Sequence, residues 1–369
     1  MKILFILENY HPKIGGLEKL FKLLVETLTD QGHEISILTN GSGVQMPWLE
    51  KSQNLRIYRL PFFNRYLFTF LAVIPGIWLA ARNDLIHTTS YNAGIPAWLA
   101  GKLTKTKVVI TFHEVWAELW DTLPFFSPLS KKLHYRFEQF LLSLPFHFFV
   151  APSDFTRDRL IQNGIPISKV NRIYNGLDYE KYLRQDPLPK SPSKTPFSFL
   201  YFGRLGISKG LELLVAAAEI MQENNNDFVL TLILPTQPKP LLKTILALID
   251  KHHVQDKVQL QHHLSEEALA ETVQASGCVV IPSHSEGFCF VAVETIAWGT
   301  PILSSGRGAL TEVISGKHIT YPEQSAVGLA KGMSEALAGK WHETPMKKFP
   351  LAESVAEYVK LYNKIKSDP

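Results

Sequence analysis

Two glutamates in the second half of the chain have a spacing suited to binding chemistry. Glu286 lies just before a predicted helix and Glu294 lies inside it, with residues 287–293 between them. Eight residues of helix span roughly 12 Å, so the two carboxylates suit the two ends of an extended ligand. The free N–H groups and the dipole at the helix start favour a phosphate group nearby. Glutamate is common on solvated helix faces, so either one alone would be weak evidence.

Two basic residues follow the strand predicted at 197–202. Arg204 and Lys209 lie on the glycine-bearing turn 203–210, where both cations could converge on one diphosphate. Arginine would grip it with a planar fork and lysine as a point charge. The alternative is two solvated basic residues in a loop. Glycines on both sides favour the anion site.

The first half of the chain offers a glycine pair and a histidine. Gly15 and Gly16 follow the predicted strand Lys2–Glu8, where glycines let backbone N–H groups approach a ligand closely. An ordinary tight turn would explain them as well. His113 follows the apolar strand Val108–Phe112 and should emerge at the carboxyl edge of a sheet, although a lone histidine is more often structural.

Strand patterns alternate with helix patterns along the chain, which predicts parallel sheets whose ligands bind at the carboxyl ends of the strands. The length of 369 residues predicts two domains. A Pro, Ser and Lys-rich stretch marks the linker between them. We predict an N-terminal domain at 1–182, a linker at 183–196, a C-terminal domain at 197–345 and a terminal helix at 346–369.

Composition places the chain among globular proteins, since 46% of it is hydrophobic and 20% is charged. The net charge of +4 permits attraction to anionic surfaces without demanding nucleic acid, which we do not expect as a partner. Cys278 and Cys289 are expected to be small core residues in a reducing compartment. The first residues turn polar at once, so we predict a first strand and not a signal peptide. These features together indicate a cytoplasmic protein.

Two apolar segments bear on membranes. Tyr66–Ala81 is shorter than a usual membrane span, and we predict a buried helix packed against a sheet; an apolar surface is the alternative. Residues 115–149 combine aromatic side chains with a basic cluster, which suits a helix lying on an anionic bilayer. A buried aromatic core with a solvated basic face is the other interpretation. The residues concerned are Trp116, Trp120, Leu123, Phe125, Phe126 and Leu129, with Lys131, Lys132, His134 and Arg136.

The stretch 281–313 closely resembles the signature of retaining nucleotide-sugar glycosyltransferases of family 4, which have two Rossmann-like domains and are called GT-B enzymes. Cys289 replaces the usual second glycine of that signature. Residues 203–210 resemble the family's diphosphate element, and Gly15, Gly16 and Glu18 resemble its glycine loop. The signature positions that match are Pro282, Ser283, Glu286, Gly287, Phe288, Glu294, Ala297, Gly299 and Pro301.

The resemblance implies two Rossmann-like domains facing across a cleft, with a C-terminal helix that returns to the first domain. It implies retaining, metal-independent transfer of a hexose-type sugar from a UDP- or GDP-linked donor, with no cofactor, to a glycan or lipid-linked acceptor in cell-surface polysaccharide or glycolipid synthesis. An anionic membrane surface would be a further partner, at the inner face of the membrane. The implied catalytic residues are His113, Glu286, Arg204 and Lys209; the donor site adds Gly15, Gly16, His263, Gly287, Phe288, Cys289 and Glu294; Glu18 and Trp116 lie on the acceptor side.

Two departures from the family pattern keep other functions open. Pro235 follows a strand where the family has a glycine motif, and His262 stands where glycine is usual. One alternative is another GT-B enzyme, such as an epimerase or a sugar-phosphate synthase. A second is a catalytically inactive relative that serves as a binding or scaffold subunit.

Overall fold

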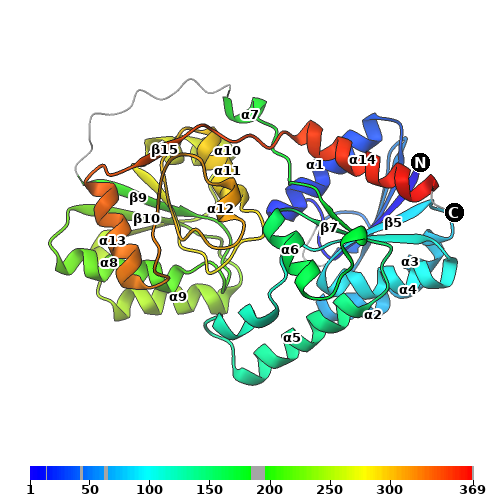
Figure 1. Ribbon diagram of the computed structural model, residues 1–369, viewed down its shortest axis with the longest axis horizontal. Helices are drawn as coiled ribbons and strands as arrows, with labels where there is room; N and C mark the ends of the chain where they lie inside the picture. The colour runs from blue at the N-terminus through cyan, green and yellow to red at the C-terminus, as the bar shows by residue number, and fades with distance from the viewer. Residues whose placement is uncertain (14, 42–44, 62–64, 184–195, 368–369) are drawn as a thin grey trace. The chain divides into compact units, whose positions relative to one another are not determined.

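The computed structural model describes residues 1–13, 15–41, 45–61, 65–183 and 196–367. The chain divides into two compact units (Figure 1). Unit 1 holds residues 1–121, 127–176 and 351–369, and unit 2 holds 122–126 and 177–350. Most of the predicted linker 183–196 lies outside the described residues.

Unit 1 is built on a sheet of eight strands within the described part of the chain, in the order β3-β4-β2-β1-β5-β6-β7-β8. All neighbours pair in parallel except β3, which is antiparallel to β4. The strands are β1 Lys2–Leu7, β2 Glu34–Asn40, β3 Leu49–Lys51, β4 Leu55–Leu60, β5 Leu85–Thr89, β6 Lys107–Thr111, β7 Phe148–Ala151 and β8 Val170–Arg172.

Helices cover both faces of this sheet (Figure 1). Side chains alternate between the faces with the period of two that a strand imposes. Leu4 and Ile6 of β1 pack towards α2–α5, whereas Phe5 packs towards α1 and α14. The helices are α1 Gly16–Asp30, α2 Arg65–Leu71, α3 Val73–Ala80, α4 Gly94–Thr104, α5 Pro128–Ser143, α6 Asp154–Gln162 and α14 Leu351–Ser367.

Unit 2 repeats this plan on a sheet whose described strands run in the order β11-β10-β9-β12-β13-β14-β15. β15 is antiparallel to β14. Its elements are α7 Glu180–Leu183, β9 Phe197–Phe202, α8 Leu211–Glu223, β10 Phe228–Ile233, α9 Lys239–Lys251, β11 Val258–Gln261, α10 Glu266–Ala275, β12 Cys278–Ile281, α11 Phe290–Ala297, β13 Ile302–Ser304, α12 Leu310–Val313, β14 Gly316–Thr320, α13 Ala326–Leu337 and β15 His342–Thr344.

The predicted fold class is confirmed, because both units are doubly wound α/β sheets and α14 belongs to the first unit. The strand order reverses between β1 and β5 in unit 1 and between β9 and β12 in unit 2. In open sheets of this kind, ligands bind outside the carboxyl ends of the strands at such reversals.

The prediction of one buried helix at Tyr66–Ala81 was wrong. The segment forms two short helices, α2 and α3, and only one side of them is buried. Phe68, Ala72 and Leu79 pack in the core of unit 1, while Phe70 and Ile74 are exposed. Hydrophobicity all round a helix normally indicates burial on every side, and that rule fails here.

A buried histidine in unit 1 gives a testable pH dependence. The two ring nitrogens of His87 lie 2.6 Å from the Tyr362 hydroxyl and 2.8 Å from the Thr111 hydroxyl. Burial, with a smaller repulsion from His113, lowers the pKa of His87 to about 3. The unfolded chain therefore binds a proton at this residue below its ordinary pKa, while the folded chain does not.

We expect the free energy of unfolding to fall as the pH drops from about 6.5 towards 3, by up to about 1.4 kcal/mol per pH unit from this group. His87→Gln cannot take up the proton, so its free energy of unfolding should depend less on pH across that range. Urea unfolding at pH 7, 6 and 5 measures both proteins. Equal slopes for the variant and the wild type would contradict the assignment.

Candidate active site

In unit 2, the two loops that follow β9 and β12 are held against each other. The turn after β9 ends at Gly210, whose φ of 66° is one that glycine adopts readily. A Cβ atom at Gly210 would lie 2.1 Å from the carbonyl oxygen of Pro282, at the end of β12. The His284 amide donates to the carbonyl of Ser208 at 2.8 Å. Glycine is therefore needed here for the close approach of two backbones.

This approach brings Glu286 and Lys209 together. Glu286 is 6% exposed, and its Oε1 accepts hydrogen bonds from Lys209 Nζ at 2.8 Å and from Ser283 Oγ at 2.6 Å. Its backbone is fixed too, because a Cβ atom at Gly308 would lie 2.4 Å from the Glu286 carbonyl oxygen. The Ala309 amide donates to that same oxygen at 2.8 Å. A carboxylate and an ammonium thus meet in a fixed position where the strand order reverses.

The environment of this pair keeps neighbouring groups protonated. Burial, reinforced by the nearby Glu286 carboxylate, raises the pKa of the Cys289 thiol and of the Tyr201 hydroxyl. A protonated thiol is a poor nucleophile, so Cys289 is not suited to covalent catalysis. Cys289 has a φ of 79°, at the position where the resemblance leads one to expect glycine. The backbone keeps the glycine-like conformation although the side chain has changed.

The second predicted cation, Arg204, is placed differently. Its side chain is exposed, while its carbonyl oxygen accepts a hydrogen bond from Tyr201 at 3.2 Å. The structure therefore joins Lys209 to Glu286 and leaves the Arg204 guanidinium in solvent beside the same turn.

Glu294, on α11, meets a residue that sequence reasoning missed. Its Oε1 accepts a hydrogen bond from the Tyr182 hydroxyl at 2.7 Å. The Tyr182 ring lies 5.0 Å from the ring of Trp298, and burial together with the Glu294 carboxylate raises the pKa of Tyr182. Tyr182 precedes Glu294 by 112 positions, and no local pattern relates the two.

The two departures from the family pattern are adjacent in unit 2. The His262 ring donates from Nδ1 to the carbonyl of Leu234 at 2.6 Å, at the end of β10. His263 is exposed and lies 3.2 Å from the Thr236 hydroxyl through Nε2. The histidines therefore tie this loop to the end of β11.

Gly287 and Phe288 are buried between Glu286 and α11. The Phe288 ring packs edge-on against Phe349 at 5.3 Å. Neither residue has a polar side chain, so any hydrogen bond that they make to a ligand would come from their backbone groups.

In unit 1, the predicted glycine loop lies at the reversal between β1 and β5. Glu18 is in the first turn of α1 and is 9% exposed. A Cβ atom at Gly15 would lie 2.1 Å from Glu18 Oε2, so glycine at 15 makes room for this carboxylate. Gly16 begins α1. Among the described residues, Glu18 Oε2 is buried without a hydrogen-bond partner, which is unusual for a carboxylate oxygen.

His113 follows β6, as the sequence predicts. Its ring lies perpendicular to the ring of Phe21, on α1, with centroids 6.1 Å apart. His113 and Glu18 are therefore near the same edge of the unit 1 sheet, since both follow strands that flank β5.

Trp116 is held by a buried carboxylate that the sequence did not reveal. Glu138 of α5 is fully buried and accepts hydrogen bonds from the amides of Trp116 at 3.0 Å and Ala117 at 2.6 Å. It also accepts from Trp120 Nε1 at 3.2 Å and from the Tyr91 hydroxyl at 3.1 Å. The segment after His113 is thereby fixed, and the Trp116 side chain is buried rather than open to an acceptor.

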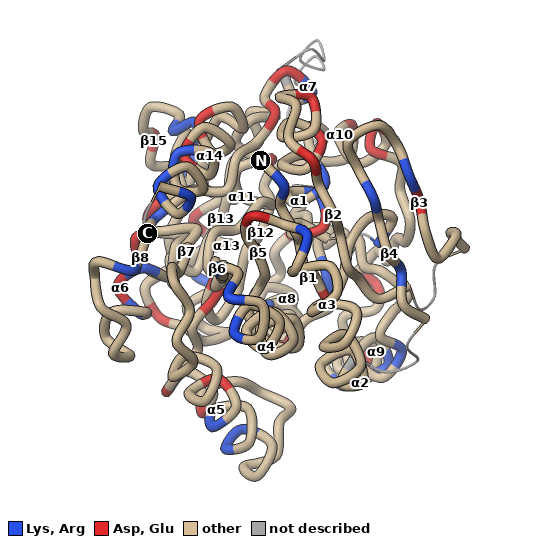
Figure 2. The backbone as a smooth tube through the Cα atoms, turned by 90° about the vertical axis from the view of Figure 1, so that its right-hand side faces the viewer, with Lys and Arg blue, Asp and Glu red and all other residues tan. Residues whose placement is uncertain are grey.

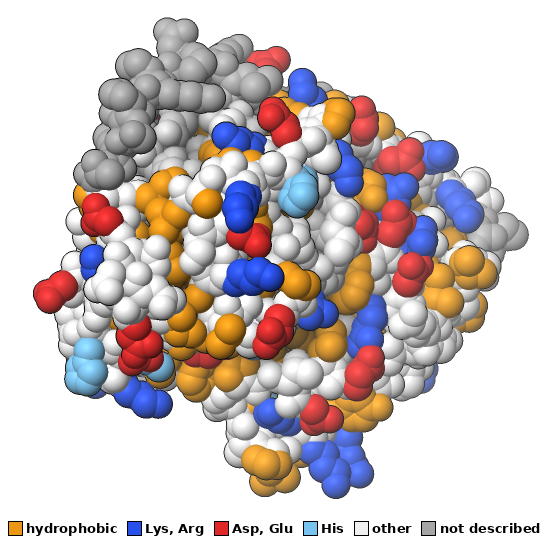
Figure 3. Space-filling view, turned by 60° about the vertical axis from the view of Figure 1, so that its left-hand side comes forward, with side chains coloured by type: hydrophobic (Ala, Val, Ile, Leu, Met, Phe, Trp, Pro, Cys, Tyr) orange, Lys and Arg blue, Asp and Glu red, His pale blue; other side chains and the backbone are white. Residues whose placement is uncertain are grey.

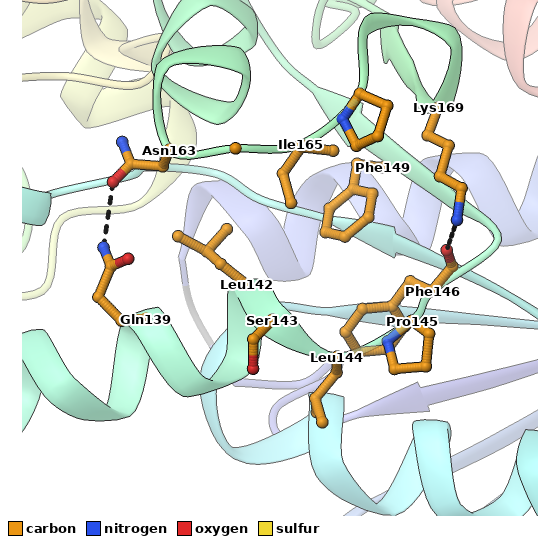
Figure 4. A pocket seen from close by; sticks show the side chains of 12 residues that line it. Gln139, Leu142, Ser143, Leu144, Pro145, Phe146, Phe149, Asn163, Ile165 and Lys169 are labelled. Carbon is orange, nitrogen blue, oxygen red and sulfur yellow. Dashed lines mark hydrogen bonds between the residues drawn. The ribbon is translucent and has the colours of Figure 1, made fainter.

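A surface pocket of about 300 Å³ lies between the end of α5 and the residues that precede β8 (Figure 4). A hydrogen bond of 3.1 Å from Gln139 to Asn163 lies on one side, and Lys169 lies on the other. These residues precede β7 and β8, so the pocket is at the amino edge of the sheet, opposite the edge that carries His113. None of the predicted site residues lines it.

Among the described residues, no three His, Cys, Asp or Glu side chains are grouped so that they could hold a metal ion. In the same part of the chain, no helix has both the length and the hydrophobicity to cross a bilayer.

The Glu138 cluster gives a prediction about stability. Glu138→Ala would leave two buried amides, an indole and a hydroxyl without their acceptor, and each such group costs about 1–3 kcal/mol. We expect a loss of roughly 3 kcal/mol or more in the free energy of unfolding. Glu138→Gln keeps one acceptor oxygen and should lose less. Urea unfolding measures the free energy of unfolding of both variants, and Glu353→Ala, at an exposed glutamate, is the control. A loss within about 0.5 kcal/mol for Glu138→Ala, which is the usual range for surface changes, would contradict the role of Glu138 as a buried acceptor.

Comparison with known proteins covers nearly the whole chain. The family model described as Glycosyltransferase Family 4 matches residues 14–181, and the model described as Glycosyl transferases group 1 matches residues 185–355. The gap between the two matches is residues 182–184, and the second match includes most of the predicted linker 183–196.

Two curated relatives illustrate the sequence similarity. A GDP-mannose:cellobiosyl-diphosphopolyprenol alpha-mannosyltransferase from Xanthomonas campestris is 27% identical, over 82% of this chain and 78% of its own length. An alpha-monoglucosyldiacylglycerol synthase from Streptococcus pneumoniae is 24% identical, over 91% of this chain and 78% of its own length.

Two solved structures share the fold. A sucrose-phosphate synthase from Thermosynechococcus elongatus superposes with a TM-score of 0.81 at 20% identity, covering 100% of both chains. HepE from Anabaena, in complex with UDP-glucose, superposes with a TM-score of 0.70 at 17% identity, covering 99% of this chain and 100% of its own. The two family models, one on each half of a GT-B pair of Rossmann-like units, establish that the chain belongs to the family 4, group 1 glycosyltransferases.

Proposed function

We propose that the chain is a retaining, metal-independent glycosyltransferase that moves a hexose-type sugar from a UDP- or GDP-linked donor. The observation that carries the proposal is the contact between Lys209 and Glu286 at the strand reversal of unit 2. In a nucleotide sugar, the anomeric carbon and the β-phosphate are joined through one oxygen. A cation for the phosphate and a carboxylate for sugar hydroxyls must therefore be neighbours, and here they are 2.8 Å apart.

The residues of unit 2 supply the chemistry that departure of a diphosphate needs. Lys209 would neutralise charge that develops on the leaving phosphate, and Arg204 would swing in from solvent to the same group. The N-terminal dipole of α11 would add to this stabilisation. Glu286 would hold hydroxyls of the donor sugar.

Glu294 would accept hydrogen bonds from the ribose diol in place of the one from Tyr182. The acceptor would attack from the face that the leaving phosphate occupies, so that the phosphate can assist removal of its proton and the anomeric configuration is kept. The resemblance gives His113 the role of a hydrogen-bond partner for a sugar hydroxyl.

For the acceptor, we propose a glycan or a lipid-linked molecule met at the inner face of a membrane. The names of the relatives from X. campestris and S. pneumoniae describe a diphosphopolyprenol and a diacylglycerol product, which supports a lipid-linked acceptor. Of the aromatic residues predicted for a membrane surface, Trp116 and Trp120 are buried, whereas Phe125 is exposed. A membrane surface on α5 is still supported by the exposed cations Lys132 and Arg136, which lie beside exposed Leu129 and Leu133.

Turnover of a donor panel tests the proposed reaction. We expect release of UDP or GDP from one of UDP-glucose, UDP-galactose, UDP-N-acetylglucosamine or GDP-mannose, stimulated by an extracted lipid fraction and unaffected by excess EDTA. The linkage formed should keep the configuration of the donor. Stimulation by fructose 6-phosphate alone would favour a sugar-phosphate synthase, and binding of a nucleotide sugar without any turnover would favour an inactive binding subunit.

The two cations should each matter for the diphosphate. We expect Lys209→Ala and Arg204→Ala each to weaken UDP or GDP binding by about tenfold to a hundredfold, since a charge-assisted contact contributes about 1.5–3 kcal/mol. Turnover should fall at least as far. Titration calorimetry measures the affinity, and Lys243→Ala, an exposed lysine on α9, is the matched control. Unchanged affinity for both nucleotides in both variants would rule out this diphosphate site.

A further inference from the structure

The helices α2 and α3 present an apolar surface to solvent. Six large side chains along them are between 43% and 79% exposed, with Ile74 and Phe70 the most exposed. We call this surface the α2–α3 face; it consists of Tyr66, Leu67, Phe70, Leu71, Ile74 and Trp78. Single exposed apolar residues are ordinary on proteins, but a run of six on two consecutive helices marks an interaction surface.

The orientation of these helices is fixed by the core beneath them. Phe68, Ala72 and Leu79 are at most 3% exposed and pack with the strands of unit 1. Turning the helices to hide the α2–α3 face would bring these residues out into water. The face therefore stays outward, and a partner outside unit 1 must cover it if it is to leave water.

The order of residues along the α2–α3 face matches a bilayer interface. Tyr66 and Trp78, which combine an apolar ring with a polar group, stand at its two ends, and the positions between them carry purely hydrocarbon side chains. Tyrosine and tryptophan favour the boundary between headgroups and hydrocarbon. The Arg82 guanidinium stacks on the Trp78 ring at 4.1 Å, so a cation stands at one border of the apolar strip.

The charge of the whole helix layer indicates which kind of bilayer. Within residues 66–82, 94–105 and 128–143, all of them described, Glu138 is the single acidic residue and it is fully buried. The exposed charges of this layer are therefore cationic, from Arg82, Lys102, Lys105, Lys132 and Arg136. Helices α1 and α14, on the other face of the same sheet, expose both signs, with Glu26, Asp30, Glu353 and Glu357 among the acidic side chains.

The cationic helices and the apolar face lie on one side of unit 1. In both ribbon and tube views, α2, α4 and α5 are at the lower side of this unit (Figures 1 and 2). The space-filling view shows basic and hydrophobic side chains next to each other on the lower protrusion that α5 forms (Figure 3). A cation-rich layer around an apolar strip is complementary to anionic headgroups over hydrocarbon.

We propose that the α2–α3 face inserts into the interface of an anionic glycerophospholipid bilayer, while the cations of α4 and α5 contact its headgroups. The inference deepens the proposed function and rests on it for the reason a membrane is needed, since a lipid-linked acceptor is met there. A second copy of the chain is a poorer occupant. A two-fold contact through this layer would place the same cations opposite one another.

Sedimentation with vesicles tests the proposal. We expect the wild-type chain to bind vesicles of equal parts phosphatidylglycerol and phosphatidylcholine, and to bind pure phosphatidylcholine at least tenfold more weakly. Phe70→Glu combined with Ile74→Glu should weaken binding to the anionic vesicles by tenfold or more, even in low salt. The matched control is Ile167→Glu combined with Val327→Glu, two apolar side chains that are 72% and 63% exposed elsewhere, and it should bind as the wild type does. Lys132→Glu combined with Arg136→Glu should remove the preference for anionic lipid.

A second measurement does not depend on the acidic variant folding. Brominated acyl chains quench the fluorescence of an indole that is inserted among them. The wild type should therefore lose more fluorescence than Trp78→Phe, and the difference should equal the contribution of one tryptophan. Equal vesicle binding by the Phe70/Ile74 variant, or equal quenching with and without Trp78, would overturn the proposal. A dimer that this variant converts to a monomer, with no vesicle binding by the wild type, would overturn it in favour of self-association.

These outcomes are independent of the proposed reaction. Vesicle binding that depends on the α2–α3 face, in a chain that turns over no nucleotide sugar, would refute the proposed reaction and leave the lipid surface standing. Turnover of a nucleotide sugar by a chain that binds no vesicles would refute the lipid surface and leave the proposed reaction standing.

Discussion

The contact between Lys209 and Glu286 is the interaction on which the rest of unit 2 depends. Both side chains are largely buried, and a buried ion pair is stable only if its geometry and remaining hydrogen bonds offset the cost of removing two charges from water. Ser283 supplies one such bond, and glycines at 210 and 308 let three backbone segments close around the pair. The strand order then places the pair where the sheet opens a binding crevice.

Unit 1 repeats the plan with a different chemical content. Its reversal carries Glu18 and His113, whose carboxylate and imidazole suit hydroxyl groups, and the half-buried ammonium of Lys13 in the same loop interacts with Glu18. His87, directly behind, is kept neutral by burial and joins β5 to the C-terminal helix through Tyr362.

Much of the fold followed from local sequence patterns. The alternation of strands and helices predicted two doubly wound sheets, and the apolar runs that end in Pro282 or His113 identified the strand ends that carry polar residues. The sequence placed Lys209 on the turn after β9 and Glu286 on the loop after β12, and the structure adds the contact between them. These inferences succeeded because parallel strands bring their carboxyl ends to one edge, whatever the rest of the chain does.

Other features depend on contacts that no local pattern encodes. Tyr182 reaches Glu294 from a short helix far back in the sequence, and Glu138, in a helix rich in basic residues, is buried among four donors from other parts of unit 1. The prediction of one buried helix for the α2–α3 segment failed for a different reason. Its hydrophobicity predicts removal from water, which a core and a membrane surface satisfy equally, so the sequence could not distinguish between them.

The most direct test of the account is the affinity of Glu286→Gln for UDP or GDP without a sugar. If Lys209 is shared between Glu286 and the diphosphate, removing the charge of Glu286 frees the ammonium and lessens repulsion of the phosphates. Titration calorimetry should then show tighter binding of the nucleotide diphosphate by the variant than by the wild type, and weaker binding of the nucleotide sugar, which loses a hydroxyl partner. Weaker or unchanged binding of the diphosphate would contradict the claim that this pair marks the junction of phosphate and sugar.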